Sequence, residues 1–204
     1  MRAAMGVAAL TLVSLPINSL SAQTASTSPD TAAPLQIHFV DNFTQTFAVP
    51  SEFLWAELKR MYVDGNKYRD LGFSVEMIAP APEAPLGGTV VVQHSDVGEA
   101  ARITALFSAI DDANRFLALR AIYSTGITVH VSYDVRPAPD GSLVQLIVHA
   151  QQPLEVVGTH PTAEDARREA NRLTAFHYAQ LADTWAAEAR RVEARYREET
   201  VSPR

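Results

Sequence analysis

The order of the predicted elements is the feature that most constrains how this chain folds. A strand-like run at residues 35–49 leads into a short helix that begins at Pro50-Ser51, where Ser51 suits the N-cap position. Residues 73–152 then read as strands with short turns between them, and one long helix at 162–198 closes the chain. A single curved antiparallel sheet that wraps around the last helix accommodates this order. Such an α+β architecture leaves a place for a ligand between sheet and helix.

The strands are predicted from the alternation of their side chains. Residues 35–49, 127–136 and 144–150 carry apolar side chains at alternate positions, which indicates strands with one covered face. Turn residues separate the runs, and Pro139-Asp140-Gly141 is a strong hairpin signal. Asp41 interrupts the apolar side of the first run, so we expect a β-bulge near Asp41-Asn42.

The last helix combines a start signal with a continuous apolar stripe. Thr162 and Asp165 form a variant of the capping box that opens many helices. The stripe recurs every three or four residues, so we expect it to lie on the concave face of the sheet. Its members are Ala166, Ala170, Leu173, His177, Leu181, Trp185, Ala189, Val192 and Tyr196.

The beginning of the chain has the layout of a secretory signal peptide. Arg2 is followed by an apolar run and small residues, with cleavage expected after Ala22 and Ser21 as the alternative. A membrane anchor is the other interpretation, but the apolar run is shorter than the ~20 residues that span a bilayer. We expect no transmembrane segment after cleavage. The chain then divides into signal peptide, flexible lead-in, one domain and tail, at residues 1–22, 23–34, 35–198 and 199–204.

The charge balance and the lack of cysteine narrow the partners and the compartment. The chain has 17 basic and 23 acidic residues and a net charge of −6. It therefore lacks the basic surface with which proteins attract nucleic acid or anionic membranes. It also contains no cysteine, so secretion would not be accompanied by disulfide bonds. Export without cysteine favours a secreted protein of the bacterial periplasm.

Three segments and the last helix carry a resemblance to a known superfamily. Phe47–Trp55 looks like its strand-to-helix entry with a tryptophan, Arg102–Asn114 like its mid-sheet hairpin, and Tyr133–Gln152 like its late hairpin. Over residues 35–198 the chain resembles the START-like superfamily, also called SRPBCC, helix-grip or polyketide cyclase/Bet v 1-like. The resemblance implies a helix-grip fold with short helices after the first strand. The superfamily includes lipid and hormone binders and aromatase/cyclases, and it has no universal catalytic residues to carry over.

Five residues are candidates for ligand binding. His177 lies in the apolar stripe, where it could be a polar contact or an acid/base group, or a buried histidine with an ordinary hydrogen-bond partner. Arg120 could hold an acidic group of a ligand, because guanidinium binds carboxylates, or it could be exposed or ion-paired. Trp55, Tyr133 and Trp185 could line a pocket or belong to the core.

Metal and cofactor sites are not expected. His130 and His149 fall opposite the apolar side of neighbouring strands. They could approach each other on the outer face, as a solvated pair or as a metal pair with a third ligand, and we expect the solvated pair. No sequence motif indicates a cofactor. Apolar residues on the outer side would indicate a covered face, as in a homodimer, and these are Leu117, Leu119, Leu143 and Ile147.

These observations lead to three hypotheses about function. The first is an exported protein that binds a small hydrophobic or amphipathic molecule between the sheet and the last helix, with His177 and Arg120 to orient it. The second is a cyclase- or hydrolase-like enzyme that uses the same cavity, and the third is a structural or interaction module without a ligand. We expect binding rather than catalysis. Bulky side chains that fill the whole space between helix and sheet would contradict the first two hypotheses.

Overall fold

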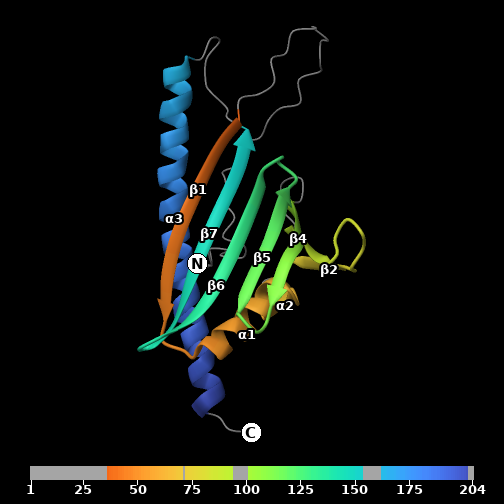
Figure 1. Ribbon diagram of the computed structural model, residues 1–204, viewed down its shortest axis with the longest axis vertical. Helices are drawn as coiled ribbons and strands as arrows, with labels where there is room; N and C mark the ends of the chain where they lie inside the picture. The colour runs from red at the N-terminus through yellow and green to blue at the C-terminus, as the bar shows by residue number, and fades with distance from the viewer. Residues whose placement is uncertain (1–35, 71, 94–100, 154–161, 202–204) are drawn as a thin grey trace, which may run out of the picture.

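A computed structural model describes residues 36–70, 72–93, 101–153 and 162–201, and Figure 1 shows the arrangement of their elements. Among the described residues, seven antiparallel strands form one sheet in the order β1-β7-β6-β5-β4-β3-β2. The predicted signal peptide and lead-in lie outside the described residues. The strands are β1 Gln36–Phe47, β2 Ser74–Ile78, β3 Gly88–Gln93, β4 Ala101–Asp111, β5 Phe116–Tyr123, β6 Thr128–Ala138 and β7 Gly141–Pro153, and the helices are α1 Ser51–Tyr62, α2 Asn66–Asp70 and α3 Ala163–Val201.

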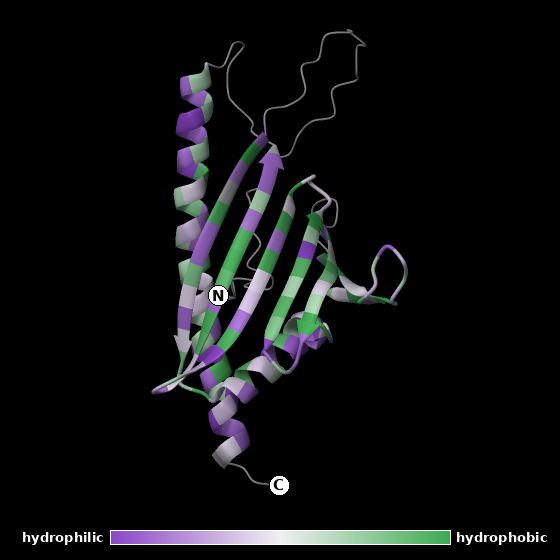
Figure 2. Ribbon diagram, viewed as in Figure 1, coloured by the Kyte–Doolittle hydropathy of each residue, from purple (hydrophilic) through white to green (hydrophobic). Residues whose placement is uncertain are grey.

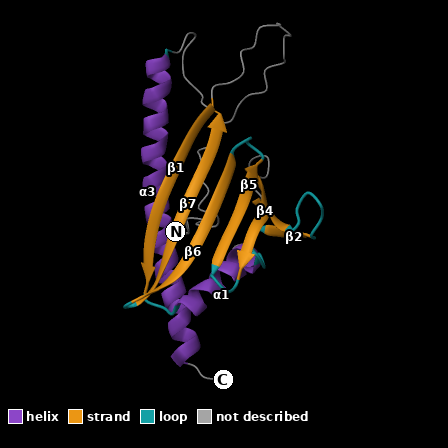
Figure 3. Cartoon of the chain, viewed as in Figure 1, coloured by secondary structure: helices purple, strands orange, loops and turns teal. Residues whose placement is uncertain are grey.

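The predicted α+β architecture is confirmed, with two short helices after the first strand and a long helix at the end (Figure 3). The alternation that predicted the strands is visible as alternating hydropathy along β1 and β7 (Figure 2). The capping box is also confirmed, because the Asp165 amide donates to Thr162 Oγ1 at 3.1 Å and the Thr162 amide donates to Asp165 Oδ2 at 3.0 Å. The last helix continues to Val201, three residues past its predicted end.

Two local predictions about the first strand and helix are wrong. β1 pairs with β7 without a register shift from Gln36 to Phe47, so Asp41-Asn42 forms no bulge. The strand instead keeps its alternation and turns the polar Asp41 inward. Ser51 is not the N-cap of α1, because the helix begins at Ser51 itself after Pro50. The Ser51 hydroxyl lies 3.2 Å from Glu52 Oε1 and makes no capping bond.

Helix α3 runs along β1 and in the same direction, as Figure 1 shows. The ring centroids of Phe43 and Tyr178 are 6.0 Å apart, and those of Phe47 and Trp185 are 6.2 Å apart. Beyond the strand, the Ala48 amide donates to Glu193 Oε1 at 2.9 Å. The apolar stripe is buried mainly between residues 173 and 192, where these contacts hold the helix against the inner face of the sheet.

A cluster of charged side chains joins α3 to α1. Glu57 on α1 is buried, and its carboxylate lies 3.0 Å from Arg195 Nη1, 4.0 Å from Arg191 Nη2 and 3.5 Å from Arg60 Nε. The three arginine side chains keep between 24% and 37% of their surface exposed. One buried carboxylate therefore meets three partly solvated cations where the two helices cross.

Glu57→Gln is expected to lower the free energy of unfolding by about 2 kcal/mol. The substitution keeps the shape of the side chain but removes the charge that offsets the arginines, which remain partly hydrated. Urea denaturation followed by circular dichroism measures the effect. Glu199→Gln is the matched control, because Glu199 also pairs with Arg195, at 2.9 Å, but is exposed. That control should cost about 0.5 kcal/mol or less, and equal losses in the two variants would contradict a structural role for the buried carboxylate.

Candidate functional site

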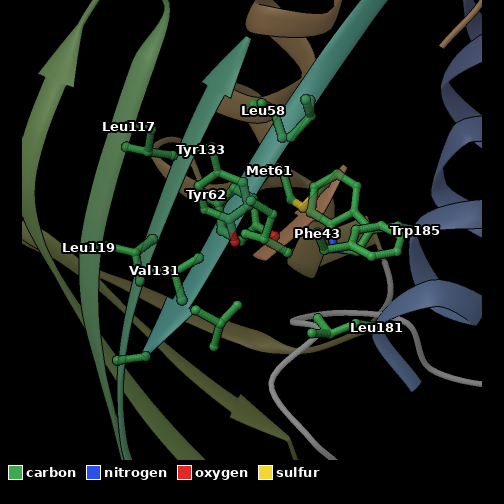
Figure 4. Packing of buried hydrophobic residues seen from close by; sticks show 14 of the residues in the cluster. Phe43, Leu58, Met61, Tyr62, Leu117, Leu119, Val131, Tyr133, Leu181 and Trp185 are labelled. Carbon is green, nitrogen blue, oxygen red and sulfur yellow. The ribbon is translucent and has the colours of Figure 1, made fainter. Parts of the chain in front are cut away.

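Aromatic side chains fill the interior between the sheet and α3 near the crossing with α1. The ring centroids of Tyr62 and Tyr133 are 4.7 Å apart, those of Tyr133 and Trp185 are 5.8 Å apart, and Phe47 contacts the other side of Trp185. Figure 4 shows Tyr62 and Tyr133 overlapping beside Trp185 of α3. All four side chains are buried. Any space for a ligand must therefore lie away from this aromatic layer.

The aromatic layer contains polar atoms that are removed from water. Burial raises the pKa of Tyr62 and Tyr133 well above the ordinary tyrosine value, and a side-chain hydrogen bond joins the two phenols. Burial and the nearby Tyr62, Tyr123 and Glu188 likewise raise the pKa of Tyr68. The Tyr68 hydroxyl and the Trp185 indole nitrogen have no hydrogen-bond partner among the described residues. Buried polar atoms of this kind usually have one.

Side chains become smaller on the inner face of the sheet farther from α1. The strand register places Ala150, Val129, Ala121 and Ala105 in one row across four strands, and all four are buried. Four residues along each strand towards α1, the row on the same face contains Leu146, Tyr133 and Leu117. The inner face thus carries one row of small side chains beyond the bulky rows next to α1.

Two ionisable side chains are buried beside this small-residue row. His177 on α3 is only 4% exposed, and burial lowers its pKa to about 4, so the imidazole is neutral at pH 7. Asp41 on β1 is 5% exposed, and burial raises the pKa of its carboxyl. One carboxylate oxygen, Asp41 Oδ2, has no hydrogen-bond partner among the described residues. This end of the interior therefore combines apolar walls with two polar groups.

Three of the five predicted ligand-binding residues lie in the interior between the sheet and α3. Tyr133 and Trp185 are in contact within the aromatic layer, and His177 lies two helical turns before Trp185 on the same stripe. Trp55 belongs to the core but points to the β4–β5 turn, where its Nε1 donates to Asp112 Oδ1 at 2.7 Å. Lys59 Nζ lies 2.6 Å from the same carboxylate oxygen. Trp55 and Lys59 together therefore connect α1 to the β4–β5 turn.

Of the two interpretations of Arg120, a ligand contact or an exposed side chain, the structure shows the exposed side chain. Arg120 is exposed on the outer face of β5, where it pairs in register with His130 of β6. Its neighbours Leu119 and Ala121 take the inward positions, so the strand alternation directs Arg120 away from α3. A role for Arg120 in orienting a ligand at the inner site is thereby removed.

The outer face carries a row of histidines. His130 and His149 are directly opposite each other, with ring centroids 6.3 Å apart, and His38 of β1 lies 6.2 Å from His149. Burial, Arg120 and His149 together lower the pKa of His130. The approach of His130 and His149 on the outer face is therefore confirmed. Among the described residues, no group of three or more His, Asp or Glu side chains is arranged to hold a metal ion.

The prediction of an apolar outer face is correct for two residues and wrong for two. Ile147 is 41% exposed on the outer face, near Val40, which is 64% exposed, and Leu143 is half-buried there. Leu117 and Leu119 are instead fully buried on the inner face. Apolar residues occupy both faces of β5, so the alternation of this strand does not indicate which face is buried. Whether this face forms a homodimer stays a prediction.

Sequence reasoning missed three of the buried polar residues. Asp41 was interpreted as the sign of a bulge, although its position in the alternation already placed it on the inner face. Tyr68 lies in a short helix whose packing the local sequence does not reveal. Glu188 is buried next to the apolar stripe of α3, and only its spacing of three from Trp185 could have indicated this.

Comparisons with known proteins bear on the fold. No protein-family model matches the chain. No curated protein matches it either. Solved structures that resemble it share little sequence. Protein SA2116 of unknown function from Staphylococcus aureus has a TM-score of 0.53 and 8% identity, over 76% of this chain and 95% of that one.

Two further solved structures match the chain with lower TM-scores. Ara h 8.0201 has a TM-score of 0.47 and 18% identity, over 74% of this chain and 99% of its own. The ZhuI aromatase/cyclase from Streptomyces sp. R1128 has a TM-score of 0.47 and 16% identity, over 77% of this chain and 95% of its own. In the described part of the chain, no helix is both long and apolar enough to cross a membrane. With its seven-stranded antiparallel sheet and the long closing helix packed on it, the described part of the chain has an α+β helix-grip fold, and the SA2116 structure shares this fold.

Proposed function

We propose that the protein binds a small hydrophobic or amphipathic molecule between the sheet and α3, beside the row of small side chains. The observation that carries this proposal is the change in side-chain size along the inner face, from the aromatic layer to Ala105, Ala121 and Ala150. Apolar walls with a few polar groups are typical of small-molecule sites. The unpartnered buried oxygen of Asp41 supports the same location.

Binding is favoured over acid–base catalysis by the state of His177. A general base works best when its pKa lies near the working pH. Burial lowers the pKa of His177 to about 4, which makes its imidazole a weak base at pH 7. A neutral imidazole can still donate or accept a hydrogen bond from a bound molecule. We therefore assign His177 to ligand contact.

Native mass spectrometry of the purified mature chain, followed by extraction of small molecules, tests the proposal. A variant that should block the proposed ligand position and its matched control both lie on β5. Ala121→Leu adds bulk to the inner face of β5, whereas Ala118→Leu adds the same bulk to the outer face. We expect Ala121→Leu to fold and to lose the ligand, and Ala118→Leu to retain it.

A different set of results would contradict ligand binding. In an interior that is already full, Ala121→Leu would overpack the core and destabilise the fold by about 1–3 kcal/mol. Together with an apo mass for the wild type and no thermal shift against an amphiphile panel, that loss would contradict ligand binding. A structural or interaction module would then be the better description.

The beginning of the chain supports the further proposal that the protein is exported to the bacterial periplasm. Arg2, the following apolar run and the small residues up to Ala22 have the order of a cleavable signal. Cell fractionation with N-terminal sequencing of the purified protein checks this. A mature N-terminus at Gln23, or at Ala22 for the alternative site, is expected in the periplasmic fraction. An uncleaved chain in the cytoplasm would contradict it.

A further inference from the structure

Asp41 is a buried acidic residue on the inner face of the sheet. It lies opposite Val148 of β7 in a row that continues through Val131 and Leu119. These neighbours are apolar and buried, and Asp41 itself is 5% exposed. The row adjoins the small-residue row that contains Ala150 and Ala121, so the carboxyl lies at the border of the proposed ligand position.

The nearest part of α3 can be identified from the register of the helix on β1. Phe43 contacts Tyr178, and Phe47 contacts Trp185, so strand and helix advance together. Asp41 precedes Phe43 by two residues on the same face, about 7 Å along the strand. It therefore faces the turn of α3 before Tyr178, the part of the helix where Leu173 and His177 are buried.

The Asp41 carboxyl lacks the partners that buried acids normally have. Among the described residues, Asp41 forms no ion pair, and its Oδ2 accepts no hydrogen bond. Removing a carboxyl from water without such compensation is costly. Burial accordingly raises its pKa. A partner that arrives from outside the chain would offset this cost.

We propose that Asp41 binds the amino group of an amphipathic amine whose apolar part lies along the small-residue row. This inference rests on the proposed function and specifies its ligand class. A protonated amine supplies both hydrogen-bond donors and the opposite charge, so it makes a stronger contact with a carboxylate than a hydroxyl group does. Val148, Val131 and Ala150 offer only apolar contact, and the His177 imidazole is neutral at pH 7, so Asp41 supplies the charge that selects the head group.

Binding of octylamine, octan-1-ol and octanoate to the full mature chain at pH 7 tests this, because the three probes share one apolar tail. Isothermal titration should show that the wild type prefers the amine over the alcohol by about tenfold or more. Asp41→Asn, which keeps the shape and removes the charge, should bring the two affinities to within about twofold of each other. Asp140→Asn, the same change in the exposed β6–β7 turn, should leave the preference intact.

Asp41→Leu separates recognition from folding. If Asp41 serves a ligand, replacing an unpartnered buried acid by an apolar side chain should remove the amine preference and leave the Tm equal or higher. A lower Tm would indicate a structural partner for the carboxyl and would overturn the proposal. An amine preference that survives Asp41→Asn, or alcohol binding with no amine preference, would also overturn it while leaving the proposed function standing. Failure to bind any of the three probes would overturn the proposed function itself.

Discussion

Trp185→Ala is expected to lower the free energy of unfolding by about 3–5 kcal/mol. Trp185 is 1% exposed and stands between Phe47 of β1 and Tyr133 of β6. Its indole is the part of α3 that closes the aromatic layer (Figure 4). Removing it would leave a cavity that the rigid sheet on one side and α1 on the other can only partly close. Urea denaturation followed by circular dichroism measures the loss.

Two further variants show how much of the expected loss of stability depends on the buried indole of Trp185. Trp185→Phe keeps an aromatic ring and removes the unpartnered indole nitrogen, so it should cost less than half as much as the alanine variant. Tyr178→Ala removes another aromatic side chain from α3, but this one is 49% exposed and meets Phe43 edge-on, so it should cost about 1 kcal/mol. A loss of about 1 kcal/mol or less for Trp185→Ala would mean that the aromatic layer does not hold the helix to the sheet.

Acidification from pH 7 to pH 4 is expected to remove about 3 kcal/mol of stability through His177 alone. The unfolded chain protonates this imidazole near its ordinary pKa of 6.5, whereas burial lowers the pKa in the folded chain to about 4. Between these values the unfolded state holds more protons than the folded state. The contribution of His177 is therefore fully present above pH 6.5 and is lost as the pH falls towards 4.

Asp41 acts in the opposite direction and must be separated from His177. Burial raises the pKa of the folded-state carboxyl above its ordinary value of 3.8, so the folded chain keeps this proton to a higher pH than the unfolded chain. The stability that depends on Asp41 therefore declines as the pH rises. Because the two effects oppose each other, the pH profile of the wild type alone understates the part due to His177.

Denaturation of the wild type and His177→Leu at several pH values from 7 to 4 isolates the histidine. The difference in stability between the two chains should change by about 3 kcal/mol across this interval, always to the disadvantage of the wild type at low pH. His149→Leu, on the exposed outer face, should show no comparable change. Parallel profiles for the wild type and His177→Leu would mean that the imidazole reaches water in the folded protein.

The sequence predicted the elements more reliably than the direction of individual side chains. Alternation and turn residues were enough to place the strands, and the Thr162–Asp165 pair marked the start of α3. The same alternation is ambiguous in β5, where leucine, alanine and isoleucine occupy both faces. The prediction that Leu117 and Leu119 lie on the outer face is therefore wrong. Only pairing with β6, which fixes Leu119 opposite Val131, resolves the direction of that strand.

The candidate site was predictable only where a side chain belongs to a long periodic pattern. His177, Leu181 and Trp185 repeat at helical spacing, so their common face could be inferred from α3 alone. Asp41 could not be recognised in this way, because a polar residue within an apolar pattern is more often a break in the strand than a buried acid. The packing of Tyr62 against Tyr133 depends on contact between α1 and β6, which no local signal encodes.

The contacts between β1 and α3 determine when this protein can fold during its synthesis. The Ala48–Glu193 hydrogen bond joins positions 145 residues apart, and β1 also pairs with β7 over its whole length. A fold dominated by such distant contacts forms slowly, because long loops must close before their contacts can stabilise the structure. The first strand can therefore form these contacts only after the last helix has left the ribosome. A chain whose first strand stays unpaired until synthesis ends is also the unfolded form that the proposed export would require.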